Sequence, residues 1–280
     1  MLSDKRSLTT ISIRTVTSLL LFAASACSSE RPGEDPVAVT QQALRPYLHF
    51  GTRCQDDYQN GWAVTWSTYG MCNDFNNGIR QYTNFDVIDF YYNLHGAQAD
   101  IQTTSDTCLS CGGADSVDFF FIATHGNFNS TSSALAMWDQ GVSAWTSQMR
   151  LGDNGKQLSV FAAYSCLTMS NGDGHLFTRW YPPFAGGLKI AVGAYGNVYD
   201  GNDQKGTEFA TRIEQEQQIG FSWNEAVWYA DNNNQPLSLA SGANSTDCWN
   251  RHPATLTSVQ TLPRLRDGAI GYFCWSNWSG

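Results

Sequence analysis

Charged residues are scarce in this sequence, and so are several signals that would assign a function at once. Only 15% of the 280 residues are charged, the net charge is −9, and no cluster of Lys and Arg follows the first fifteen positions. The sequence therefore lacks the basic surface with which proteins bind nucleic-acid phosphates. It also lacks G-x-S-x-G, the phosphate-binding G-x-x-x-x-G-K-[ST] and the zinc-binding H-E-x-x-H. These absences argue against nucleic acid as a partner and against three common catalytic or metal motifs.

The N-terminus carries the pattern of an export signal. Basic residues come first, the apolar run Ser18–Ala24 follows, and Ala24, Ser25 and Ala26 form a small-x-small cleavage site. We therefore predict that residues 1–26 direct export. No other stretch approaches the roughly 18 apolar residues of a membrane-spanning helix.

Cys27 directly follows this signal and indicates that the signal is of the lipoprotein type. The letters "ASAC" that end at Cys27 resemble a bacterial lipobox, in which the Cys is acylated and becomes the new N-terminus. This predicts a cell-envelope lipoprotein that meets the membrane only through a lipid anchor; the alternative is ordinary secretion with Cys27 left as a thiol. Residues 27–46 are polar and contain Pro, which favours a disordered tether or pro-segment. Residues 47–280 then form a single domain, a size within the usual range.

The cysteine count fits an oxidising compartment. Seven cysteines remain after Cys27, an odd number where thiols normally pair, so one is expected to stay free. Cys166 ends an apolar run, whereas the other six lie in polar, turn-rich sequence. These six would pair locally, although sequence alone allows fifteen arrangements: Cys54 with Cys72, Cys108 with Cys111, and Cys248 with Cys274.

Four apolar or β-rich runs predict strands of a mostly parallel sheet. Two of them are continuous apolar runs of strand length, as in strands covered on both faces. Residues at helical spacing follow the fourth run: Phe209, Ile213 and Glu216 form a first group. A second group continues after a break at Gly220, where Ser222 and Glu225 form a capping-box pattern. This alternation predicts an α/β fold with helices on both faces of the sheet. The four runs are 85–94, 117–124, 158–165 and 187–196.

Three segments are harder to interpret. Residues 50–84 are rich in Gly, Asn and Asp and predict irregular structure with short strands. Part of 133–150 is expected to be helical, although Gly141 and Ser143 weaken that pattern. The tail 237–280 is expected to be an appendage that carries the last two cysteines.

His125 and Cys166 each end one of the two apolar strands. Functional groups gather at the carboxyl ends of parallel strands, because the loops there open onto the crevice beside the sheet. An imidazole near a thiol favours the thiolate, the form that attacks a carbonyl. Gly126 lets the backbone approach a substrate, and its amide with that of Cys166 can form an oxyanion hole.

These residues resemble the superfamily of cysteine peptidases that includes caspases, legumain, gingipains and clostripain. The shared features are an apolar strand ending in His-Gly, a second ending in small-small-Cys, and a separation of 41 positions (166 − 125) between His and Cys. Over 119–230 the chain is more similar to a bacterial domain family of unknown function with the same core. The resemblance implies a caspase-like three-layer sandwich, His125 as base, Cys166 as nucleophile and the Gly126 and Cys166 amides on the oxyanion.

Tyr164 departs from the pattern of the proteolytic relatives. Two positions before the nucleophile, those relatives hold a specificity-pocket residue that is commonly Gln, Glu or Asp, and this chain has Tyr164. A Tyr at this position can form the floor of a pocket for an apolar or aromatic side chain. It can also fill the pocket and leave the fold without peptidase activity.

Other motifs carry weaker alternatives. His95-Gly96 also follows a strand candidate and is a second candidate base. Cys108-x-x-Cys111 is half of a zinc or redox motif, but its turn-like surroundings favour a short disulfide. The Gly-rich loop 197–206 holds two Asp residues, which makes it either a Ca²⁺ site or a solvated loop. No cofactor is required by the chemistry of the pair.

Two functions follow from the sequence. The first is an exported cysteine peptidase that hydrolyses peptide or protein substrates through a thioester acyl-enzyme. The second is a catalytically inactive surface module of the same fold, whose Trp- and Tyr-rich loops bind glycans or proteins.

Overall fold

A computed structural model describes most of the chain beyond the N-terminal segments, and residues Ala43–Gly280 form one compact unit. The predictions for residues 1–46, His95, Cys108 and Cys111 lie outside the residues it describes. No helix within the described part is long and apolar enough to cross a membrane. The described residues are 48–55, 57–58, 66–81, 90–93, 101–102, 113–139, 142–153, 158–199 and 204–278.

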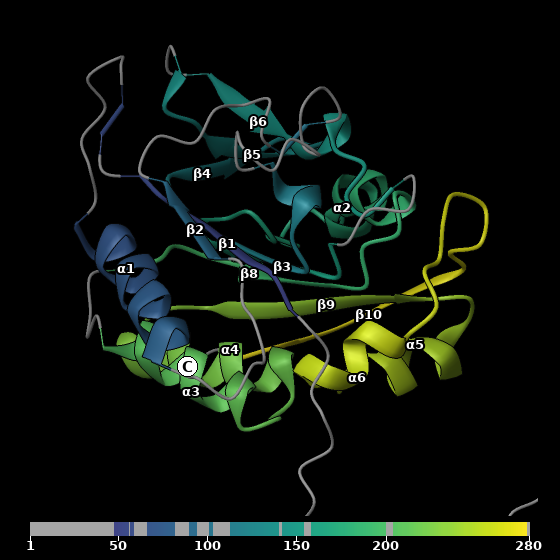
Figure 1. Ribbon diagram of the computed structural model, residues 1–280. Coiled ribbons are helices and arrows are strands. Elements are labelled where there is room, and N and C mark those ends of the chain that lie inside the picture. The colour runs from purple at the N-terminus through teal and green to yellow at the C-terminus, as the bar shows by residue number, and fades with distance from the viewer. Residues whose placement is uncertain are drawn as a thin grey trace, which may run out of the picture. The chain divides into compact units, whose positions relative to one another are not determined.

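The centre of the fold is a seven-stranded, mostly parallel sheet (Figure 1). All four predicted runs supply strands to it. The strands β2, β1, β3, β7 and β8 are parallel neighbours, and β9 and β10 each run antiparallel to the strand before them. In spatial order the strands are β10 (Tyr272–Asn277), β9 (Pro236–Gly242), β8 (Ile190–Ala194), β7 (Val160–Tyr164), β3 (Phe119–Ala123), β1 (Phe50–Cys54) and β2 (Phe90–Asn93).

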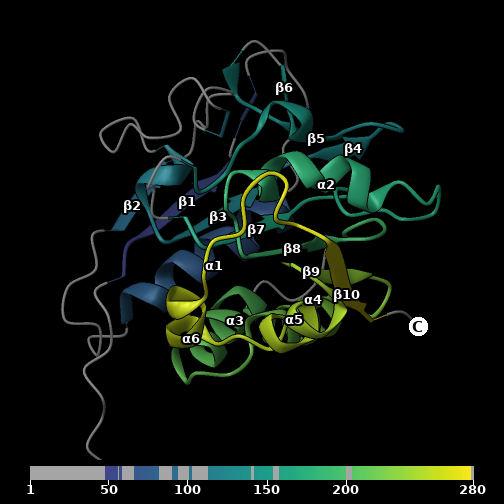
Figure 2. The same cartoon turned by 90° about the vertical axis from the view of Figure 1, so that its right-hand side faces the viewer.

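Helices cover both faces of the sheet, as the sequence predicts for a mixed α/β fold (Figures 1 and 2). One face carries five helices. The other carries α2 (Leu176–Ala185), the short 3₁₀ turns Ala114–Ser116 and Thr146–Gln148, and a three-stranded antiparallel sheet. The five helices are α1 (Trp66–Gln81), α3 (Lys205–Glu214), α4 (Ile219–Ala230), α5 (Ser245–Arg251) and α6 (Leu256–Thr261). The small sheet consists of β4 (Gly126–Phe128), β5 (Ser133–Ala136) and β6 (Ser143–Trp145).

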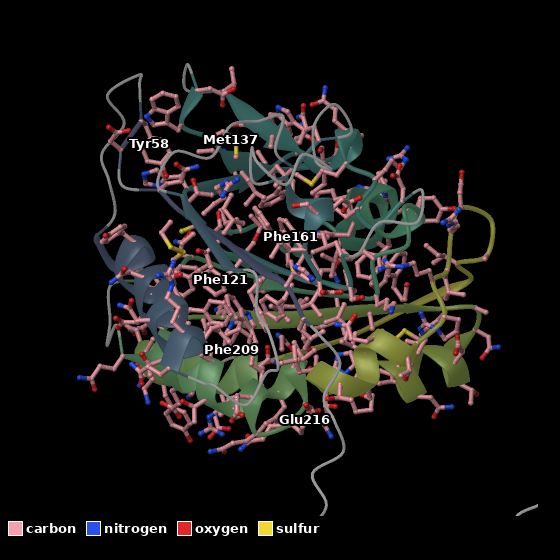
Figure 3. All side chains as sticks on the ribbon, viewed as in Figure 1. Tyr58, Phe121, Met137, Phe161, Phe209 and Glu216 are labelled. Carbon is pink, nitrogen blue, oxygen red and sulfur yellow. A yellow bond between two sulfur atoms is a disulfide. The ribbon has the colours of Figure 1, made fainter. Side chains whose placement is uncertain are left out.

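Alternation along the central strands divides the core into two layers. Phe121 packs on the five-helix side with Phe209, whereas Phe161 packs on the other side with Met137 (Figure 3). Phe75 from α1 lies 4.6 Å from Phe121 between ring centroids. Burying each such ring contributes about 1.5–3 kcal/mol, so these two layers hold β3 and β7 rigidly in place.

Two of the predicted disulfides are confirmed. Cys54 of β1 is bonded to Cys72 of α1, and Cys248 of α5 is bonded to Cys274 of β10. Among the described cysteines Cys166 is the free thiol, as the odd count predicts.

The short strand β1 agrees with the prediction for residues 50–84, but residues 66–81 do not form the irregular structure that their composition predicts. After β1 they form α1, which has sixteen residues. Its buried apolar positions, Met71, Cys72, Phe75 and Ile79, recur at helical spacing. Packing of this stripe on the sheet overrides the low helix propensity of Gly and Asn.

The predicted helical segment within 133–150 is also wrong, because β5 and β6 occupy it. The Ala and Leu residues of β5 favour helices intrinsically, but pairing with β4 and β6 on both sides stabilises the extended form.

Two further predictions are corrected near the C-terminus. The helix α4 begins at Ile219, so Ser222 lies inside it and caps nothing; the amide of Ile219 is instead satisfied by the carbonyl of Ala254 at 3.0 Å. The tail is no appendage, because β9 and β10 complete the central sheet. The strand β9 is fully buried between its two neighbours.

Candidate active site

His125 and Cys166 lie at matching positions on neighbouring strands. The last register pair of β3 and β7 is Ala123 with Tyr164, and the amide of Thr124 still donates to the Tyr164 carbonyl at 3.2 Å. His125 and Cys166 each come two residues after that pair. Adjacent strands lie about 4.8 Å apart, so the sheet places the two residues on neighbouring segments of the backbone. Both side chains are partly exposed.

Tyr58 fixes the backbone of His125. The Thr124 hydroxyl donates to the Ala136 carbonyl at 2.5 Å, so its oxygen is left to accept from the Tyr58 hydroxyl at 2.8 Å. The Tyr58 oxygen in turn accepts from the His125 amide at 3.2 Å, and the two rings lie 5.4 Å apart between centroids. Burial raises the pKa of Tyr58, which keeps the phenol protonated as a donor. The sequence offered no signal for this residue.

The Cys166 thiol is held against residue 198. The Val198 amide donates to Sγ at 3.2 Å, and Sγ lies 3.8 Å from the Val198 carbonyl oxygen. An amide N–H aimed at sulfur stabilises negative charge that develops there. The loop after β8 therefore contributes to the site, a role that the sequence did not indicate.

A strained turn follows Cys166 and presents it to solvent. Leu167 has φ of 59°, a left-handed conformation that costs a non-Gly residue about 1–3 kcal/mol. Two bonds hold the turn: the Leu167 amide donates to the Gly196 carbonyl at 2.8 Å, and the Ser170 amide to the Leu167 carbonyl at 3.1 Å. Such strain is typical of functional sites.

Gly126 brings an unused amide to Cys166. A β-carbon on residue 126 would overlap the Cys166 carbonyl oxygen and the Ser165 hydroxyl, so only Gly fits. The Ala136 amide donates to the His125 carbonyl, which makes Gly126 and Leu135 a non-hydrogen-bonded pair of the β4–β5 ladder. The Gly126 N–H therefore points away from β5. Within the described part of the chain, neither this amide nor that of Cys166 donates to another residue, so both remain for an oxyanion.

A pocket of about 500 Å³ opens beside His125 on the small sheet. This volume lies in the range of sites that take a small ligand or a large side chain. The sequence predicts a helix in part of this segment and therefore gives no sign of the pocket. Its described lining residues are His125, Gly126, Asn127, Ala134, Ala136, Ser143 and Trp145.

Tyr164 lies in the core rather than at the surface of the site. Its side chain is 2% exposed and meets Trp223 edge-on, with ring centroids 6.2 Å apart. The ring points to the five-helix side, away from solvent. Tyr164 thus contributes its ring to the core layer on the five-helix side.

The predicted cation loop lies partly outside the described residues, since both of its Asp residues, Asp200 and Asp203, fall there. Among the residues that the structure does describe, no cluster of three or more His, Cys, Asp or Glu side chains has metal-binding geometry.

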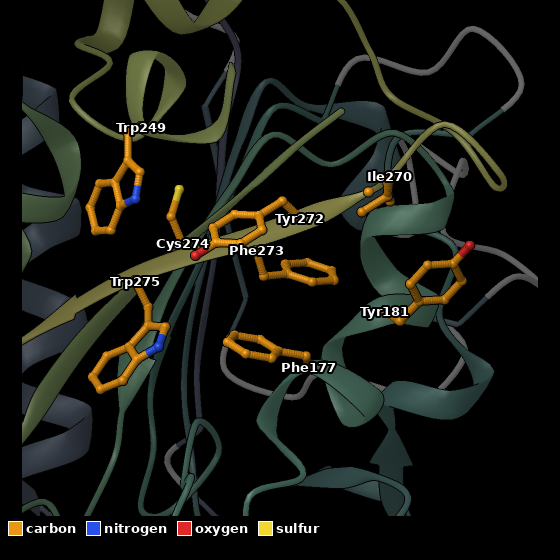
Figure 4. Close-up of a pocket in the computed structure, with 9 residues that line it drawn as sticks. Phe177, Tyr181, Trp249, Ile270, Tyr272, Phe273, Cys274 and Trp275 are labelled. Atoms are coloured by element: carbon orange, nitrogen blue, oxygen red, sulfur yellow. The ribbon is translucent and has the colours of Figure 1, made fainter. Parts of the chain in front are cut away.

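A larger pocket, of about 680 Å³, lies at the edge of the central sheet between α2, α5 and β10 (Figure 4). Aromatic rings dominate its wall: Phe177 stacks on Phe273 with centroids 5.5 Å apart, and Trp249 is half exposed. The strand β10 is three strands from β7, about 14 Å at the usual spacing. This pocket is therefore separate from the pair of His125 and Cys166.

Comparison with known proteins adds one match. The profile of a family described as "Domain of unknown function (DUF6345)" matches residues 53–255, a range that contains both His125 and Cys166. No curated protein matches the chain.

Proposed function

We propose that this chain, which belongs to the DUF6345 family of domains of unknown function, is a cysteine peptidase with Cys166 as nucleophile and His125 as base. One observation carries the proposal. The two residues follow the ends of adjacent parallel strands in matching register, and the amides of Gly126 and Cys166 donate to no other residue in the described part of the chain. A base, a nucleophile and oxyanion donors at one point are the parts that acyl transfer requires.

In the proposed reaction, Cys166 Sγ attacks the carbonyl carbon of the scissile peptide bond. His125 accepts the thiol proton and delivers it to the leaving amine nitrogen, and a thioester remains on Cys166. A water molecule then attacks the thioester carbonyl while His125 accepts its proton. The carbon–sulfur bond breaks, the acid product leaves, and the proton returns to sulfur. The amides of Gly126 and Cys166 stabilise the oxyanion both when the thioester forms and when water hydrolyses it.

The caspase-like character of the fold belongs to the same proposal. A mostly parallel sheet covered on both faces supports it, and so does a His-Gly at the end of one central strand beside a Cys at the end of the next. Tyr164 replaces the usual polar specificity residue with a buried aromatic ring. Selection of a charged side chain at that position is therefore not expected.

We also propose that the protein is exported and anchored through a lipid on Cys27. The two disulfides support an oxidising compartment, because structural disulfides rarely persist in the cytosol. Metabolic labelling with a fatty-acid analogue should mark the wild type and not Cys27→Ser; equal labelling of the two would contradict the anchor.

The test of the activity is a peptide library digested by the wild type, Cys166→Ala and His125→Ala, with and without Ca²⁺. We expect cleavage by the wild type alone, with no dependence on Ca²⁺. His95→Ala and His175→Ala are matched controls, because His95 is the alternative base and His175 is exposed after the nucleophile. Cleavage that persists in Cys166→Ala, or its absence from the wild type, would overturn the proposal.

A second candidate function is supported by the aromatic pocket at β10. Half-exposed rings such as Trp249 and Tyr272 can stack on a sugar, which favours a glycan-binding module. This alternative predicts that Cys166→Ala retains glycan binding and that Trp249→Ala loses it on a glycan array. We favour the peptidase because His125 and Cys166 follow the ends of adjacent parallel strands in matching register.

A further inference from the structure

The pocket beside His125 is built from one face of the small sheet. Strand side chains alternate, so Ala134 and Ala136 of β5 point to the same face, and their cross-strand partners Trp145 and Ser143 of β6 share it. The opposite face packs into the core through Leu135 and Ala144. The small sheet thus serves two purposes: one face anchors it, and the other forms a hollow.

The chemistry of this hollow is apolar. None of the described lining residues is an Asp, Glu, Lys or Arg. Two alanines leave open volume and Trp145 supplies a flat ring. A charged group placed here would lose water without gaining an Asp, Glu, Lys or Arg partner among the described lining residues, whereas an apolar side chain would gain burial and ring contacts.

We propose that this pocket binds an uncharged, apolar or aromatic side chain of the substrate, at the residue that follows the scissile bond. This inference rests on the proposed peptidase function for its placement. His125 must reach the leaving amine nitrogen to give it a proton, so the residue that carries that nitrogen lies next to His125. The pocket wall includes His125 itself.

The first experiment varies the residue after the cleaved bond in a peptide series. The wild type should cleave peptides with Phe or Leu there at least about tenfold faster than those with Asp, Glu or Lys. Ser143→Glu places a carboxylate in the pocket and should raise the rate for Lys relative to Phe by about tenfold. Ser147→Glu is the matched control, because Ser147 is exposed just after β6 and outside the pocket; its preference should equal that of the wild type.

The second experiment needs no turnover. N-substituted chloroacetamides alkylate Cys166: the thiolate sulfur forms a bond to the methylene carbon and chloride leaves. The N-benzyl reagent should react about tenfold faster than the N-carboxymethyl reagent. Ser143→Glu should abolish reaction with the anionic reagent, whereas Ser147→Glu should match the wild type.

The two experiments separate the two claims. If no peptide is cleaved but the alkylation preference holds and changes in Ser143→Glu, the peptidase proposal fails and the apolar pocket stands. If cleavage depends on Cys166 but shows no preference after the bond, or if Ser143→Glu leaves both preferences unchanged, the pocket proposal is overturned.

Discussion

The backbone at Gly126 lies so close to Cys166 that a side chain at residue 126 would overlap the Cys166 carbonyl oxygen. This approach joins the start of the small sheet to the turn after β7. It also brings the Gly126 backbone next to the Cys166 backbone. The shape of the site therefore depends on the lack of a side chain at one position.

Gly126→Ala should damage both stability and reactivity. Forcing a methyl group into this contact should cost about 1–3 kcal/mol of unfolding free energy, because the neighbouring groups are backbone or buried. The rate of peptide cleavage should fall by a larger factor than the loss of folded protein explains. Urea unfolding and cleavage assays check this, with Gly172→Ala as control, since no atom lies closer than 3.9 Å to a β-carbon there. A fully active Gly126→Ala would refute the proposed oxyanion role.

The Cys166 thiol should react with iodoacetamide in the native protein at neutral pH. Mass spectrometry should find the label on Cys166 and not on the four described disulfide cysteines. Removing the base in His125→Ala should slow labelling by about tenfold or more, because less thiolate forms. His175→Ala should leave the rate unchanged. Labelling that requires denaturation would contradict a reactive pair.

Tyr58→Phe should loosen His125 while leaving the packing of the ring intact. The variant removes the hydroxyl whose oxygen accepts from the His125 amide and whose O–H donates to the Thr124 oxygen, so we expect a loss of about 1 kcal/mol in stability. It should also lower kcat more than it raises KM, because His125 acts in the chemical step. Tyr229→Phe is the control, as Tyr229 is 57% exposed. Equal effects of the two substitutions would show that Tyr58 does not position the base.

Lys189 should make the free energy of unfolding depend on pH in the alkaline range. Its amine donates to the carbonyls of Val259 and Gln260 at 2.8 and 3.0 Å, and burial lowers its pKa from 10.5 to about 8. Between these values the unfolded chain binds more protons than the folded one, so stability rises with pH across that window. Urea midpoints should rise for the wild type relative to Lys189→Met. If the urea midpoints of the two proteins changed in parallel with pH, Lys189 would not be losing its proton in the folded state within this window.

The Cys248–Cys274 disulfide should contribute measurably to stability. It closes a loop of 26 residues between α5 and the edge strand β10, and replacing both cysteines by Ala should cost about 3 kcal/mol. The double variant should show a lower urea midpoint than the wild type without reductant. Adding reductant should then lower the wild-type midpoint more than that of the variant; an equal change would show that this bond contributes nothing.

Much of the central sheet can be predicted from sequence because its strands are covered on both faces. Such strands appear as continuous apolar runs, as in 117–124 and 158–165, and their order with helices predicts parallel pairing. The free thiol follows from an odd cysteine count. The helix α1 was missed because Gly and Asn obscure its apolar stripe, and β5 was missed because Ala and Leu favour helices when no partner strand is considered.

The candidate site shows the same difference between local features and tertiary contacts. Local sequence is enough to identify the side chains that follow two apolar strands, because a run of buried residues and the polar group after it are local features. Three further features depend on how the whole domain packs: the pairing of those strands in register, the contacts of Tyr58 and Val198 with His125 and Cys166, and the pocket on the small sheet. These contacts join residues far apart in the chain, and packing and hydrogen bonding select them only when the whole domain folds.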